Sequence, residues 1–170
     1  MKKIILFIII NSFCFSGIKL GFDFSKEMEV DGYNFDIDES AVIGLDINEK
    51  DSKIGFGFEY VIKADIENTT SEIGIFSMYG TYKFYEDEEK KMQAFAKFGY
   101  SHPFIDFGVD DDGVKVSGGL MFGAHFNFDK IQFSFSIHNG SWEYDYPSYY
   151  YGMDDTDVSL TRLTIFYLFF

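Results

Sequence analysis

Residues 116–137, VSGGLMFGAHFNFDKIQFSFSI, alternate large apolar side chains with small or polar ones on both sides of a two-residue break at Asp129-Lys130. Successive side chains of a β-strand point to opposite faces. A period of two therefore places Phe, Leu and Ile on one face and Gly, Ser, His and Gln on the other. The break is short enough for a tight hairpin turn. The segment predicts two adjacent antiparallel strands.

The same alternation recurs along the chain and predicts eight strands, at residues 18–24, 41–47, 54–63, 76–84, 93–100, 116–128, 131–138 and 158–170. Short turns are expected at 48–52, 86–91 and 129–130, and longer loops at 25–40, 64–72, 101–114 and 140–157. Short turns on one side and long loops on the other are typical of transmembrane barrels, whose turns face the periplasm. The predicted fold is an all-β, eight-stranded antiparallel up-and-down transmembrane β-barrel.

The composition favours the same fold. Aromatic residues make up 21% of the 170 residues, and the chain has 16 Gly but only 2 Pro, which is typical of barrels built from many short strands. A secreted β-sandwich or a lipocalin-like barrel is the alternative, but its apolar face would point inward and its outer face would be charged. Here the polar face is rich in Gly, Ser and Thr, which suit a narrow interior, and the aromatic face suits lipid.

Residues 1–16 have the features of a signal peptide. Two lysines precede the apolar run at 4–10, and cleavage is predicted near Ser16/Gly17. The apolar run is too short for a transmembrane helix, which needs about 20 residues. We therefore expect export through the Sec pathway and a barrel domain at 17–170.

Cys14, the single cysteine of the chain, lies within this leader. Lipidation at Cys14 is an alternative outcome of processing, but the bulky Phe13 stands where lipoproteins need a small residue. With cleavage downstream of Cys14, the exported protein has no thiol for disulfides or nucleophilic chemistry.

The charge and the histidines argue against several classes of function. The net charge of −14, from 28 acidic and 14 basic residues, excludes nucleic-acid binding, which needs a basic face. His138 and Ser141 are three residues apart and so lie on opposite faces of a regular strand. The histidines also lack the short ligand spacing of zinc sites. No catalytic residue, metal site or cofactor is predicted.

Charged side chains on the polar face of the strands are predicted to lie inside the barrel. These interior residues are Asp46, Glu59, Lys83, Lys97 and His125. An eight-stranded barrel is just wide enough for side chains to fill it, so opposite charges would pair into a plug. The alternative interpretation of these residues is a narrow gated pore.

The last long loop is rich in aromatic residues. Tyr149, Tyr150 and Tyr151 are consecutive, and they follow Trp142 and Tyr144. Exposed Tyr and Trp give large contact areas with few rotatable bonds, so the three tyrosines are a candidate recognition surface. The alternative is an interfacial aromatic girdle, where Trp142 and Tyr144 are expected.

With these features the chain resembles small outer-membrane proteins of the OmpX/OmpA-like, porin-like β-barrel family. The resemblance rests on the glycine-aromatic segment 118–126 and the closing segment 163–170. It implies that Phe166, Leu168 and Phe170 form the terminal signal read by the barrel-assembly machinery. It also implies contact with outer-membrane lipid and lipopolysaccharide, with the protein acting as a monomer.

The register of the last strand has two solutions. Counting back from Phe170 by twos places Arg162 toward lipid, near the loop end, where it could extend to the interface. A bulge would instead place Leu163, Ile165, Tyr167 and Phe169 outward. Because the sequence ends on this strand, a cell-wall-binding domain after the barrel is not expected.

The leading functional hypothesis is a non-enzymatic outer-membrane protein with a structural or adhesive role. Its acidic, Tyr-rich extracellular loops would contact a surface ligand. A narrow porin-like channel for small solutes or ions is the alternative. A lipid-modifying enzyme is a third hypothesis, and the sequence offers no motif for it.

Overall fold

The computed structural model describes residues 16–169 except 31, 49–51, 90, 107–113 and 145–155. This part of the chain contains nine strands: β1 (Ser16–Val30), β2 (Tyr33–Asp36), β3 (Ser40–Asn48), β4 (Ile54–Asp65), β5 (Glu72–Glu86), β6 (Met92–Asp106), β7 (Val114–Phe128), β8 (Ile131–Tyr144) and β9 (Thr156–Leu168). Within these ranges, no helix is long and apolar enough to span a membrane.

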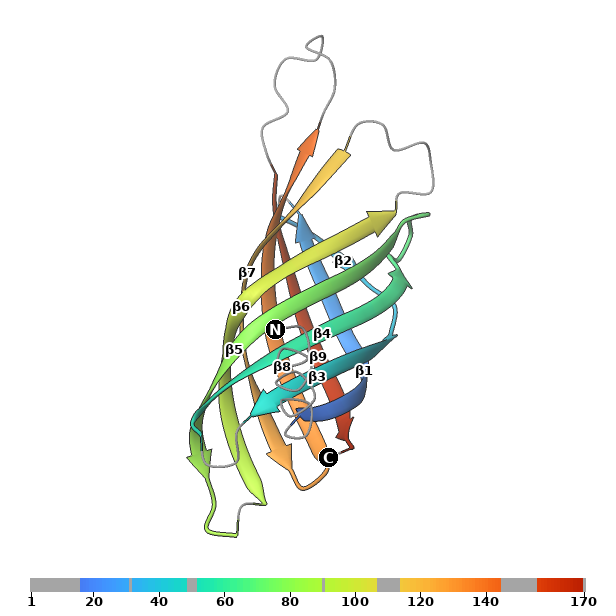
Figure 1. Ribbon diagram of the computed structural model, residues 1–170. Helices are drawn as coiled ribbons and strands as arrows, with labels where there is room; N and C mark the ends of the chain where they lie inside the picture. The colour runs from blue at the N-terminus through green and yellow to red at the C-terminus, as the bar shows by residue number, and fades with distance from the viewer. Residues whose placement is uncertain are drawn as a thin grey trace, which may run out of the picture.

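Eight of the strands form a closed antiparallel barrel (Figure 1). From β3 to β9 each strand pairs with the next along the chain, and β1 pairs with β3 on one edge and with β9 on the other. The short β2 extends the sheet beside β1 by pairing with residues 27–30. This confirms the predicted all-β, eight-stranded up-and-down barrel.

The predicted loop at 25–40 is wrong over most of its length. β1 continues to Val30, and the chain turns at Gly32, which has a φ of 79°, before returning as β2. The charges at Lys26, Glu27 and Glu29 made this stretch look like a solvated loop, but they still alternate with apolar residues. Pairing with β9 on the other side fixes the segment as a strand.

A bulge in β1 accompanies this extension. The register with β9 shifts between Asp23 and Ser25, so Phe24 and Ser25 are both exposed while Asp23 and Lys26 are both buried. An inserted residue in one strand of a pair produces this change of face. The predicted two-residue turn at Asp129-Lys130 is confirmed between β7 and β8.

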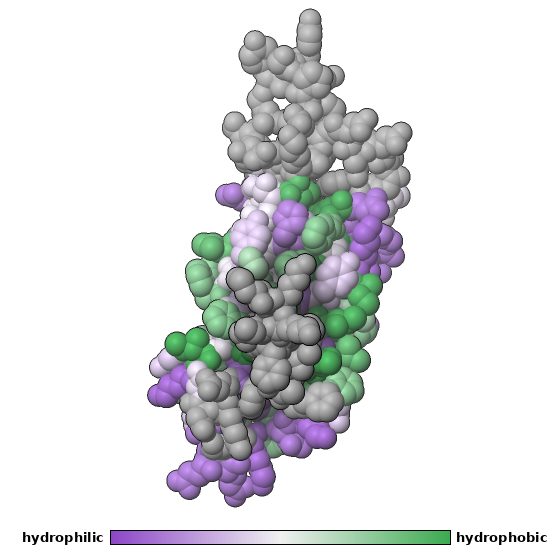
Figure 2. Space-filling view, viewed as in Figure 1, coloured by the Kyte–Doolittle hydropathy of each residue, from purple (hydrophilic) through white to green (hydrophobic). Residues whose placement is uncertain are grey.

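The outer wall is apolar. Alternate residues of each strand point outward, and most are Phe, Tyr, Ile or Leu, such as Phe56, Phe98, Phe126 and Phe133. Figure 2 shows apolar residues over the middle of the visible wall and hydrophilic ones at its lower end. A soluble barrel would bury this apolar face. Here the apolar face is on the outside, and many of the inward positions are polar or charged.

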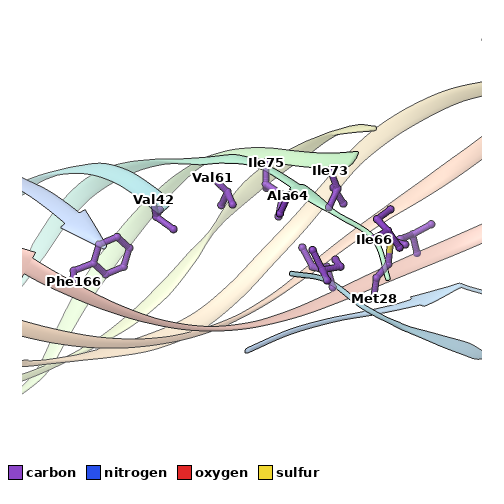
Figure 3. Close-up of a cluster of buried hydrophobic side chains, with 11 residues drawn as sticks. Met28, Val42, Val61, Ala64, Ile66, Ile73, Ile75 and Phe166 are labelled. Atoms are coloured by element: carbon purple, nitrogen blue, oxygen red, sulfur yellow. The ribbon is translucent and has the colours of Figure 1, made fainter. Parts of the chain in front are cut away.

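The lumen also contains a layer of apolar side chains, which the alternation does not predict. A cluster of buried apolar side chains, the apolar cluster, runs along the interior (Figure 3). Its members are Met28, Ile37, Val42, Val61, Ala64, Ile66, Ile73, Ile75, Val158, Leu160 and Phe166. Most of them lie near the loop ends of their strands, so aliphatic side chains fill that half of the lumen.

Candidate functional site

The five residues predicted to lie inside the barrel are all buried in the structure. Asp46 on β3, Glu59 on β4 and Lys97 on β6 come together in one network. Lys83 on β5 instead pairs with Glu86 at 2.9 Å, near the turn end. His125 makes no hydrogen bond through its ring nitrogens to any described group, and it packs on Phe95 with ring centroids 4.6 Å apart.

Lys19 on β1 is a central cation that the sequence analysis did not select. It is fully buried, and its Nζ lies 2.9 Å from Glu59 Oε1 and 3.1 Å from Asp46 Oδ2. The same atom is 2.7 Å from the Tyr79 hydroxyl and 3.0 Å from Gln132 Oε1. An ammonium has three protons to donate, and these acceptors surround it. Lys19 therefore ties β1 to β3, β4, β5 and β8 across the lumen.

Among the described carboxylates, Glu59 has the most cationic neighbours. Its Oε1 accepts from Lys97 Nζ at 2.7 Å as well as from Lys19, and the Tyr79 hydroxyl lies 2.8 Å away. Its Oε2 lies 3.5 Å from Arg162 Nη1. Burial of a carboxylate requires such compensation, because an isolated charge loses its hydration in the interior.

Arg162 and Asp23 form a bidentate pair between β9 and β1. Arg162 Nε donates to Asp23 Oδ2 and Nη2 donates to Oδ1, both at 3.0 Å, and both side chains are fully buried. The Thr164 hydroxyl also donates to Asp23 Oδ1. The planar guanidinium matches a carboxylate in this geometry better than an ammonium would.

Together these side chains form a layer that we call the charged belt: Lys19, Lys97, Arg162, Asp23, Asp46 and Glu59. Its three cations and three carboxylates balance in charge, and each is at most 7% exposed. Balanced pairing is the condition under which buried charges are tolerated. The belt links β1, β3, β4, β6 and β9 across the interior of the barrel, and its charged groups are almost entirely shielded from solvent.

A serine-histidine contact lies in the same region. Ser136 Oγ is 2.8 Å from His138 Nε2, and Arg162 Nη1 is 3.4 Å from the same nitrogen. Ser136 precedes His138 by two residues, whereas the serine weighed from the sequence was Ser141, three residues after it. No described group hydrogen-bonds His138 Nδ1, and both members of the contact are buried. The pair therefore lacks the orienting carboxylate and the exposed nucleophile of a hydrolase.

The register of β9 is the second of the two sequence-based alternatives. Leu163, Ile165 and Tyr167 point outward, whereas Arg162 and Phe166 are fully buried. Phe166 points inward, and its ring centroid lies 4.4 Å from Lys19 Nζ. The bulge that adjusts the pairing is in β1, since β9 runs without a shift against β8. The role of Phe166 and Leu168 in assembly stays a prediction.

Several predictions fall outside the described residues. These are the signal peptide over residues 1–15, the tyrosines 149–151 and Phe170, as well as the side chains of Trp142 and Tyr144. In the described ranges, no group of three or more His, Cys, Asp or Glu is arranged to hold a metal ion.

Comparison with known proteins finds similarity in structure. Neisserial surface protein A has a TM-score of 0.58 at 9% identity, covering 89% of this chain and 96% of that one. The outer-membrane protein OprG from Pseudomonas aeruginosa has a TM-score of 0.53 at 15% identity, covering 91% and 95%. Ail, the attachment invasion locus protein of Yersinia pestis, has a TM-score of 0.51 at 15% identity, covering 91% and 97%.

Sequence comparison adds no relative. No protein-family model matches the chain, and no curated protein sequence matches it. At these identities the structural likeness concerns the fold alone. The chain has the fold of the small eight-stranded outer-membrane β-barrels.

Proposed function

We propose that the protein is a non-enzymatic barrel of the bacterial outer membrane, closed along its lumen and active through its loop end at the cell surface. The apolar outer wall supports the location. In water, the contiguous aromatic face would be an aggregation liability, whereas in lipid it is the surface that a membrane barrel presents. The turns between β3 and β4, β5 and β6, and β7 and β8 then face the periplasm.

Fractionation of cells tests the location. The folded protein is expected in the outer-membrane fraction, and its migration on a gel is expected to shift on boiling, as for folded barrels. Recovery in the soluble periplasmic fraction would contradict the proposal.

The proposal that the lumen is closed rests on two layers of side chains inside it, the charged belt and the apolar cluster. The charged belt crosses the interior from β1, β3, β4, β6 and β9, and the apolar cluster fills the loop half. An eight-stranded barrel leaves no aqueous channel once side chains fill it. This favours a structural or adhesive protein over a porin-like channel.

Single-channel recording in planar bilayers should show no conductance for the wild-type protein. The Lys97→Ala variant should also stay closed, because the apolar cluster still blocks the loop half of the lumen. A large-pore porin in the same bilayer serves as the positive control. Reproducible conductance steps in the wild-type protein would favour the channel hypothesis.

The chemistry of the loop end supports an adhesive role. Acidic side chains line this end of the strands and the described loops: Glu27, Glu29, Asp36, Asp38, Glu39, Asp65, Glu67, Glu72, Asp106 and Asp157. Of the basic side chains described there, Lys26 is buried and Lys63 is paired with Asp106 at 2.7 Å. A surface with one dominant sign attracts partners of the opposite sign. The partner we propose is a cationic surface, contacted also by Tyr149, Tyr150 and Tyr151.

The proposed partner is opposite in charge to a molecule bound by one structural neighbour. Ail of Yersinia pestis has been crystallised in complex with the heparin analogue sucrose octasulfate. A polyanion of this kind would be repelled by the acidic loop end described here, because like charges oppose association.

Adhesion of cells that display the protein provides the test. Binding to surfaces coated with a cationic peptide should exceed binding to heparin-coated surfaces, and salt should weaken it. The Glu39→Gln/Glu67→Gln variant and deletion of Tyr149–Tyr151 should each reduce binding. The Glu88→Gln/Glu89→Gln variant, with the same charge change at the turn end, should bind like the wild type. Equal binding by all four proteins would contradict the adhesive role.

A further inference from the structure

The outer wall has a groove over β4, β5 and β6. It has a volume of about 430 Å³, and its floor includes Gly80. The outward side chains around it are Phe56, Phe58, Met78, Phe98 and Tyr100. These neighbours are apolar or aromatic, so the groove presents hydrocarbon and ring surfaces to its surroundings.

The groove exists because one side chain is missing from the aromatic wall. Gly80 pairs with Phe56 on β4 and with Phe98 on β6, at an outward position of β5. A Cβ at Gly80 would meet nothing closer than the carbonyl oxygens of Phe98 and Gly55, at 3.8 and 3.9 Å. Packing therefore does not require glycine here.

The neighbouring rings leave this gap open. Phe56 and Phe98 are 62% and 61% exposed, more than any other described Phe, and Phe98 stacks toward Phe122 on β7 with ring centroids 6.4 Å apart. Gly74, at another outward position of β5, behaves differently. It is buried, and a Cβ there would lie 3.3 Å from the Val61 carbonyl oxygen and 3.4 Å from the stem of Lys63. A glycine on the outer wall can thus be covered by its neighbours, and Gly80 is not.

The position of the groove identifies its occupant, given the membrane location proposed above. Phe56 is the third residue of β4 counted from the turn end, and Gly80 is nearer to the turn end of β5 than to its loop end. With the turns in the periplasm, the groove lies toward the periplasmic leaflet, which consists of phospholipid. A gap one side chain wide, between rings on adjacent strands, suits a linear hydrocarbon chain. We propose that the groove binds one acyl chain of a phospholipid from this leaflet.

Photo-crosslinking tests the proposal. The folded full-length protein is placed in phosphatidylethanolamine vesicles containing a trace of phosphatidylcholine with a diazirine on its acyl chain. Labelling of the peptides that contain Phe56 and Phe98 should exceed, several-fold, labelling of those that contain Phe126 and Phe133 on other strands. Gly80→Leu, which places a branched side chain on the floor of the groove, should remove this excess. Ala41→Leu places the same side chain at an outward position of β3 outside the groove, and should retain it.

Other results of this experiment distinguish failure of the acyl-chain site from failure of the proposed membrane location. Equal labelling of all outward-facing peptides would overturn the acyl-chain site while supporting the membrane location. Protein–protein crosslinks that Gly80→Leu abolishes would assign the groove to a second copy of the chain and overturn the lipid site. Absence of labelling anywhere on the wall would overturn the membrane location itself. Heat-modifiable migration of both variants shows that each has folded before it is compared.

Discussion

Replacing Glu59 by glutamine is expected to lower the free energy of unfolding by about 3–5 kcal/mol, the usual cost of removing one partner from a buried ionic group. The substitution keeps the size of the side chain and removes its charge. Lys19, Lys97 and Arg162 would then face two carboxylates in the lumen, where hydration cannot compensate. The measurement is urea unfolding of the protein in phospholipid vesicles, with stability taken from the linear dependence on denaturant.

Two further variants make this result specific to the charged belt. Glu72→Gln removes an exposed carboxylate that lies 3.4 Å from Lys63, and it should leave the unfolding midpoint nearly unchanged, because exposed pairs contribute little. In Glu59→Gln/Lys97→Met the number of cations again equals the number of anions. This double variant should be less destabilised than the sum of the single ones. Additive losses would mean that the Glu59–Lys97 pairing does not couple the two residues.

Replacing Ile73 by alanine is expected to lower the free energy of unfolding by about 2–5 kcal/mol, as for other truncations of a buried isoleucine. Ile73 is 2% exposed and belongs to the apolar cluster. It also borders a cavity of about 20 Å³ beside Ile75, Val158 and Leu160. The truncation would enlarge this cavity, and strands fixed by backbone pairing can close it only in part.

The loss of unfolding free energy should increase with the volume of side chain that is removed. Ile73→Val deletes one methylene and should cost roughly 0.5–1.5 kcal/mol under the same unfolding conditions. Neither variant should conduct ions in planar bilayers, because the charged belt remains in place. A loss for Ile73→Ala no larger than that for Ile73→Val would show that the loop half of the lumen is loosely packed.

Local alternation was sufficient to predict the strands and part of the lumen. Asp46, Glu59 and Lys97 lie on the polar face of strongly alternating segments, so their inward direction follows from the period of two. Tyr79 lies at an inward position by the same rule, between Ser77 and Thr81. It was missed because its residue type suggested the lipid face, although its hydroxyl needs the polar partners of the lumen.

The apolar cluster could not be read from the sequence in the same way. Around Ile73 and Ile75 both faces of β5 are poor in charge, so alternation loses its contrast there. Ile37 and Ile66 fall in segments predicted as loops, and each forms an isolated bridge with the other. Their burial depends on how two connections fold into the barrel mouth, which local pattern does not encode.

The partners within the charged belt also depend on non-local geometry. Arg162 and Asp23 are separated by 139 residues, and they meet because the barrel closes with a particular register. Inspection of β9 alone left the direction of Arg162 open. In the structure, β9 alternates regularly and places Arg162 on the inward face with Thr164. The bulge between Asp23 and Ser25 lets β1 present both Asp23 and Lys26 to the same interior, and a bulge has no reliable signature in a single sequence.

The Arg162–Asp23 pair crosses the seam where the first barrel strand meets the last. Until β9 reaches β1, Asp23 lacks its guanidinium and Arg162 lacks its bidentate carboxylate, so a nearly closed barrel would lack the close contacts between these two ions. Partly zipped forms are then unfavourable, and closure should be cooperative. The same pair opposes parting of β1 and β9 in the finished barrel, because separation would break two charge-assisted hydrogen bonds in a medium of low dielectric and leave Arg162 with Glu59, at 3.5 Å, as its carboxylate partner. No turn or loop joins β1 directly to β9, so side-chain and backbone pairing alone hold this seam together.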